Sequence, residues 1–239
     1  MSTKRNRIVM VGTALCLLLT AGGAAGQQAF NVTPTADNAY AFYIGDGTSA
    51  TSFEGWQPIT GSIWAVESYD RVAPDTSWVY IAAWSDHGSF QGLLVDFMNQ
   101  TNGGRVLGGD TIWWEVTATG DMHEEDDPPS LDWMTEKILE ANAGMNPSGG
   151  WVTPAVSPLT NAEGGIHNVS VVDIEDDSRW MWYDCGRQTD PGEPNPPFQG
   201  GFNHDEYLIF RIPVTAPEPA SLSLLALGGV VLLVRRRMA

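Results

Sequence analysis

The chain is poor in cysteine and in basic residues, and the apolar segment of its tail is shorter than the roughly 20 residues that a full-length transmembrane helix needs. Its 239 residues include two cysteines, Cys16 and Cys185, which excludes a disulfide framework. Only 12 Lys and Arg residues oppose 29 Asp and Glu residues, for a formal net charge of −17. A surface this acidic repels nucleic acid, so we expect no nucleic-acid partner.

The first 26 residues have the three parts of a secretory signal peptide. Three basic residues come first, residues 8–20 form an apolar segment, and residues 21–26 are all small. This order predicts a signal helix over residues 1–26, with cleavage after Gly26 or Ala25. The protein is therefore expected to be exported.

Cys16 would leave with the signal peptide, so Cys185 becomes the single cysteine of the mature chain. We interpret Cys185 as a buried, unreactive thiol. A disulfide between two chains and a catalytic nucleophile are the alternatives, although no His-Asn context accompanies a nucleophile.

The chain ends in Pro217-Glu218-Pro219, an uncharged apolar segment, and Arg235-Arg236-Arg237. A helix over the apolar residues 222–234 covers roughly 20 Å, which is less than the roughly 30 Å hydrocarbon core of a bilayer. We expect a short, weak membrane helix over residues 220–234, with the arginines on the cytoplasmic side. A buried core helix is the alternative.

In this order, the three parts of the tail resemble the PEP-CTERM sorting signal of exported bacterial proteins, also described as an ice-binding-protein C-terminal domain. The resemblance implies cutting near Pro217-Glu218-Pro219 by an exosortase-type protease. It also implies a transient stay in the inner membrane, followed by transfer to the cell surface or to extracellular polysaccharide. Residues 37–46, 80–86 and 203–211 are similar to segments of other PEP-CTERM proteins, which have no assigned activity.

Between the two signals, residues 27–214 have the length of one domain, and residues 215–239 belong to the sorting region. The domain contains 28 acidic residues and six basic ones. Such acidity is typical of a soluble exported protein or of one that binds divalent cations.

Short segments rich in β-branched and aromatic residues, separated by Gly, Asn, Asp and Pro, predict an antiparallel β-sandwich or jelly roll. Residues 78–84 are apolar throughout, as expected for a strand buried on both faces. The eight predicted strands are residues 39–44, 62–67, 78–84, 91–97, 111–119, 169–174, 179–183 and 207–214.

One short helix is predicted after Ser130, which is a suitable N-cap, and before Gly144, which is a suitable stop. Its apolar stripe consists of Leu131, Met134, Ile138 and Ala141.

Two acidic runs, residues 123–127 and 173–177, are the candidate metal sites. We interpret both as solvated loops, with calcium as the alternative and no other cofactor expected. The first run lacks the second histidine of a zinc-protease helix, and Asp173 and Glu175 would share a face if their segment were a strand. The candidate calcium ligands are Glu124, Asp126, Asp127, Asp173 and Glu175.

All ten tryptophans lie in the predicted domain. Trp180 and Trp182 are two residues apart and would share one strand face, where exposed rings could stack on sugars. Core packing is the favoured alternative, because aromatic rings fill β-sandwiches well. Trp113 and Trp114 are adjacent, so they should point in opposite directions.

These features predict a non-catalytic cell-surface or extracellular-matrix protein that is exported and then processed by an exosortase. The alternative is a carbohydrate-binding β-sandwich module that acts on exopolysaccharide. A secreted hydrolase is a weaker alternative, since the sequence has no Gly-x-Ser-x-Gly motif and no phosphate-binding loop. We therefore expect no enzyme activity.

Overall fold

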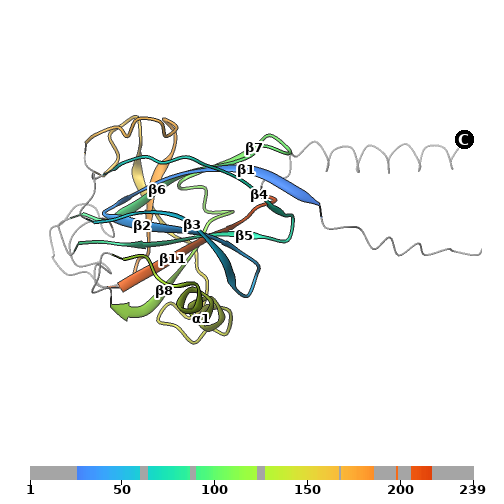
Figure 1. Ribbon diagram of the computed structural model, residues 1–239. Coiled ribbons are helices and arrows are strands. Elements are labelled where there is room, and N and C mark those ends of the chain that lie inside the picture. The colour runs from blue at the N-terminus through green and yellow to red at the C-terminus, as the bar shows by residue number, and fades with distance from the viewer. Residues whose placement is uncertain are drawn as a thin grey trace, which may run out of the picture.

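The computed structural model describes residues 26–59, 64–86, 90–122, 127–166, 168–185, 198 and 206–216. This part of the chain forms two antiparallel sheets, A and B, that face each other, with one short helix on the outer face of sheet B (Figure 1). The predicted mainly β, antiparallel architecture is confirmed. The predicted signal peptide and the tail residues 217–239 lie outside the described residues, apart from Gly26. In the described ranges, no helix combines the length and the apolar character that crossing a membrane requires.

Sheet A has the strand order β4-β1-β6-β10-β9, with β7 paired to β6, and sheet B has the order β3-β2-β5-β11-β8. The strands of sheet A are β1 (Gln27–Asp37), β4 (Tyr69–Pro74), β6 (Gly92–Asn99), β7 (Gly104–Leu107), β9 (Ala155–Thr160) and β10 (Arg179–Trp182). The strands of sheet B are β2 (Ala39–Gly45), β3 (Ala50–Gln57), β5 (Trp78–Trp84), β8 (Glu115–Met122) and β11 (Glu206–Pro213).

The central strands of sheet B are apolar on both faces because both faces are covered. Alternate residues of each strand belong to two separate clusters, one between the sheets and one under the helix. This confirms the prediction that residues 78–84 form a strand buried on both faces. The residues of β2, β5 and β11 in the inter-sheet cluster are Tyr40, Phe42, Ile44, Val79, Ile81, Ala83, Leu208, Phe210 and Ile212.

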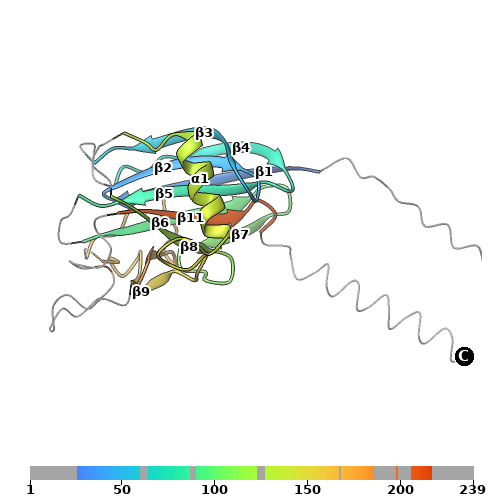
Figure 2. The same cartoon turned by 90° about the horizontal axis from the view of Figure 1, so that it is seen from below.

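The helix α1 (Leu131–Asn142) lies across the outer face of sheet B (Figure 2). Ser130 caps it, because its hydroxyl accepts a hydrogen bond of 3.2 Å from the backbone N–H of Trp133. Met134 and Ile138 are fully buried and belong to the same cluster as Ala41 and Ala82, whose small side chains let the helix approach the sheet. The predicted cap and apolar stripe are confirmed.

The predicted strands over 39–44, 91–97, 179–183 and 207–214 are confirmed, with ends that move by one or two residues. The strand predicted over residues 111–119 begins only at Glu115. The backbone N–H groups of Trp113 and Trp114 both donate to the carbonyl of Asp110, and this turn delays the strand.

The strand predicted over residues 169–174 is wrong. The side-chain amide of Asn161 donates to the carbonyls of Val171 (2.9 Å) and Ile174 (3.0 Å), and its oxygen accepts the N–H of Val171 at 2.8 Å. One buried side chain thus takes the backbone groups that a strand ladder would use. The strand predicted over residues 62–67 is also wrong where it is described, since residues 64–67 form a turn and irregular backbone.

The chain enters and leaves the sandwich at the same end. The N–H of Asp75 donates to the carbonyl of Gly26 at 2.8 Å, and the N–H of Val214 donates to the carbonyl of Ser77 at 3.1 Å. Both termini of the domain therefore meet at the β4–β5 turn, on the right in Figure 1. Because β5 runs away from this turn, Trp84 and the paired ends of β8 and β11 lie at the opposite end.

Candidate functional site

A groove of about 360 Å³ opens between α1 and sheet B, at the end of the sandwich opposite the termini. Its volume is at the lower end of the range of roughly 300–1,000 Å³ that is usual for ligand pockets. We call it the aromatic groove. Its lining residues are Met122, Asp127, Pro128, Pro129, Ser130, Trp133 and Tyr207.

Three aromatic rings run from the core to the surface of this groove. The Tyr207 ring lies 5.2 Å from the Trp84 ring at 67° and 5.1 Å from the Trp133 ring at 64°, measured between centroids. Such edge-to-face contacts are favourable and fix the orientation of each ring. Trp84 is fully buried, whereas Tyr207 and Trp133 are half-buried and contribute to the groove surface.

A carboxylate holds the Trp133 indole in place. The indole N–H donates to Asp121 at 2.8 Å, and the same oxygen lies 3.0 Å from the Lys137 ammonium. Lys137 also contacts Glu140 at 2.9 Å. Burial alone would lower the pKa of Lys137, but its hydrogen bonds to Glu140 and Asp121 outweigh burial and raise this pKa. Lys137 therefore stays charged and keeps Asp121 in position.

The opposite wall of the groove is fixed by Tyr43, whose hydroxyl donates to the carbonyl of Pro129 at 2.5 Å. Burial raises the pKa of Tyr43 well above its ordinary value, so its hydroxyl remains a neutral donor. Asp127, at the start of this wall, is exposed at the rim of the groove. The groove thus combines rigid aromatic and proline surfaces with a carboxylate in solvent.

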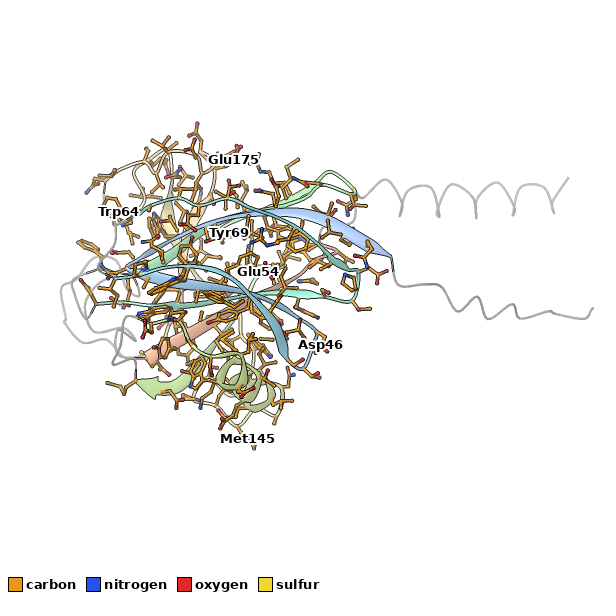
Figure 3. The ribbon with its side chains drawn as sticks, viewed as in Figure 1. Asp46, Glu54, Trp64, Tyr69, Met145 and Glu175 are labelled. Atoms are coloured by element: carbon orange, nitrogen blue, oxygen red, sulfur yellow. The ribbon has the colours of Figure 1, made fainter. Side chains whose placement is uncertain are left out.

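A second groove, of about 310 Å³, lies between residues 64–66 and the loop at residues 170–173. Trp64 and Asp173 both line it, and both have left-handed backbone conformations, with φ of 62° and 69°. These conformations are unusual for residues other than glycine. Figure 3 labels Trp64, at the left edge of the molecule.

The structure places Trp180 and Trp182 in the core, where their exposed fractions are 1% and 0%. The Trp182 ring contacts that of Phe210 across the two sheets, with 6.1 Å between centroids. Neither ring offers a face to a sugar, so core packing replaces the stacking interpretation. Of the adjacent pair, Trp114 is fully buried and Trp113 is half-buried.

The structure does not bring the candidate calcium ligands together. Asp127 and Asp173 line different grooves, and Glu175 pairs with Arg105 at 2.6 Å. Glu124 and Asp126 lie outside the described residues. Among the residues that are described, no three His, Cys, Asp or Glu side chains form a cluster suited to a metal ion.

Two further sequence predictions concern the tail and the cysteine. The sorting-signal residues Pro217, Glu218, Pro219 and 235–237 lie outside the described residues. Cys185 is free and half-buried, so it is less shielded than the predicted buried thiol.

Sequence reasoning did not single out Trp133 and Tyr207 as site residues. The available signal was the position of Trp133, which directly precedes Met134 of the apolar stripe and so lies at the border of the buried helix face. Its contact with Tyr207 joins segments far apart in the chain, and no local pattern predicts it.

No protein-family model, no curated protein and no solved structure matches this chain. Its function is therefore inferred from the residues of the aromatic groove and from the signals in the sequence.

Proposed function

We propose that this protein is a non-catalytic exported domain that binds a polysaccharide in the aromatic groove. The observation that carries the proposal is the half-buried Trp133 ring, which Asp121 holds in a fixed orientation beside Tyr207. Sugar rings present apolar C–H faces that pack on aromatic surfaces, and rigid rings lose little conformational entropy when they bind.

The predicted export signals support the same proposal. A secretory signal peptide and a PEP-CTERM-like tail would deliver the domain to the cell surface or to extracellular polysaccharide. Both termini of the domain meet at the β4–β5 turn, and the aromatic groove lies at the other end of the sandwich. A tail held at a membrane would therefore leave the groove facing outward.

The carboxylates around the groove favour binding over catalysis. Asp121 accepts hydrogen bonds from Trp133 and Lys137, and Glu206 accepts one from the backbone N–H of Gly120. Glycoside hydrolysis usually needs two carboxyl groups that flank the scissile bond and are free to exchange protons. Asp121 and Glu206 are instead occupied in holding the groove together, so that Asp127 alone, among the described lining residues, presents a carboxyl group to solvent.

The test is affinity electrophoresis of the mature protein in gels that contain exopolysaccharide from the same cells. We expect Trp133→Ala to weaken binding about tenfold, equivalent to about 1.4 kcal/mol. The matched control is Trp64→Ala, which removes a half-buried tryptophan ring from the second groove and should leave binding unchanged. Equal binding by the wild type and Trp133→Ala, with both variants folded by circular dichroism, would refute the proposal.

A further inference from the structure

The charge of the described surface restricts the kind of ligand that the domain attracts. Residues 27–214 contain six basic residues, and the five that are described all have intramolecular partners. These contacts are Arg71 with Glu54, Arg105 with Glu175, Lys137 with Asp121 and Glu140, Arg179 with the carbonyl of Pro158, and Arg211 with Glu115. In this part of the chain, every Lys and Arg side chain therefore already contacts a carboxylate or a carbonyl of the protein.

The surroundings of the aromatic groove are also acidic. Asp127 lies at its rim, with Asp121 and Glu206 beside it. The nearby cation, Lys137, bridges Asp121 and Glu140 and is only 9% exposed. The faces of the Trp133 and Tyr207 rings carry the negative part of the aromatic quadrupole. Rings and carboxylates together attract a positive group on a ligand.

We propose that the aromatic groove selects a polysaccharide with free amino groups, namely a polymer of N-deacetylated hexosamine. Its sugar ring packs on Trp133 and Tyr207, and its ammonium group pairs with Asp127. This inference rests on the proposed function and adds the chemical class of the polysaccharide.

Charge complementarity separates three classes of glycan. A polyuronate brings carboxylates towards a domain with 28 acidic and six basic residues, so long-range repulsion opposes its binding. An N-acetylated polymer keeps the stacking surface but has no charge. A deacetylated polymer adds an ion pair and a cation–π contact to the same stacking. The expected order of affinity is amine first, N-acetyl second and uronate last.

A titration of the mature protein with hexasaccharides of glucosamine and of N-acetylglucosamine tests the proposal by calorimetry. We expect the amine form to bind about tenfold more tightly at low ionic strength, and Trp133→Ala to weaken both. Asp127→Asn should reduce the preference for the amine several-fold. The matched control is Asp176→Asn, which removes the same charge from an exposed position in a loop beside sheet A.

The results that would contradict the amine selection, the role of Asp127 and the proposed function differ from one another. Equal binding of the two hexasaccharides, still lost in Trp133→Ala, overturns the amine selection and leaves the proposed function standing. Equal effects of Asp127→Asn and Asp176→Asn overturn the placement of the ammonium at Asp127. Tight binding of a lysine hexapeptide, with weak binding of both sugars, shows a peptide site and overturns both proposals.

Discussion

At the scale of single residues, the side chains that shape the groove act through contacts between distant segments. Arg211 of β11 depends on distant segments in the same way, towards the other end of the same face of sheet B: its guanidinium lies 3.8 Å from the Trp151 ring and 4.6 Å from the Trp78 ring. It also contacts Glu115 at 2.7 Å. The sequence predicts that Arg211 lies on a strand, but these three partners come from three other segments. Such sites follow from the fold and not from local patterns.

Asp96 is a buried carboxylate whose titration should affect stability. Its side chain lies in β6 with an exposed fraction of 5%, and it accepts the N–H of Glu175 at 2.8 Å. Burial raises the pKa of Asp96, although hydrogen bonds from Glu175 and Ser178 and the charge of Arg105 oppose this effect. The native state therefore binds the Asp96 proton more tightly than the unfolded state does.

The raised pKa of Asp96 determines how the free energy of unfolding changes with pH. The contribution of Asp96 to stability is full below the ordinary pKa of an aspartate and is lost as pH rises through its higher native value. Asp96→Asn cannot titrate, so it should gain stability relative to the wild type as pH rises through this window. Urea unfolding at a series of pH values from about 3 to 7 measures the difference. Parallel profiles for wild type and Asp96→Asn would contradict the assignment.

At the scale of elements, the sequence predicts best the strands that are apolar on both faces. The limits of β5 are correct, and those of β2 and β11 are nearly so, because the inter-sheet core and the helix cover both faces. The sequence does not predict β1, β3, β4, β7 and β9, because polar residues and prolines interrupt the apolar pattern of these strands. Pro34 in β1 is tolerated because β4 pairs only with residues 27–32, so Pro34 has a single neighbouring strand.

In the loop at residues 161–178, hydrogen bonds from one asparagine side chain replace the backbone hydrogen bonds that a strand would make. Asn161 is 1% exposed, and its three hydrogen bonds hold Val171 and Ile174. Asn161→Ala leaves these buried backbone groups without partners, at a cost of about 1–3 kcal/mol per group. We expect faster amide hydrogen exchange in this loop and unchanged exchange in β5.

Ser170→Ala is the control for this experiment, because Ser170 is exposed and its hydroxyl makes one long bond of 3.4 Å to the carbonyl of Ala162. It should leave the exchange of the loop nearly unchanged. If Asn161→Ala accelerates exchange equally in β5 and in the loop, the asparagine supports the whole sandwich and not the loop alone.

At the scale of the whole molecule, net charge is the dominant feature that sequence composition predicts directly. The domain has 28 acidic and six basic residues, and the described basic residues are already engaged in internal contacts. The remaining carboxylates repel one another in the compact state. The Debye length falls from about 10 Å at 0.1 M salt to about 3 Å at 1 M. The melting temperature should therefore rise with sodium chloride over this range.

Calcium and magnesium separate this general screening from a specific site. A ligand that binds only the folded state adds RT ln(1 + [L]/Kd) to the free energy of unfolding, so a calcium site would raise the melting temperature beyond the effect of ionic strength. Magnesium at equal concentration is the control, since it needs a tighter octahedral shell and loses water reluctantly. Because Asp127, Asp173 and Glu175 do not converge, we expect equal shifts from the two ions. A larger shift with calcium, abolished by Asp126→Asn with Asp127→Asn, would instead place a calcium site in residues 123–127.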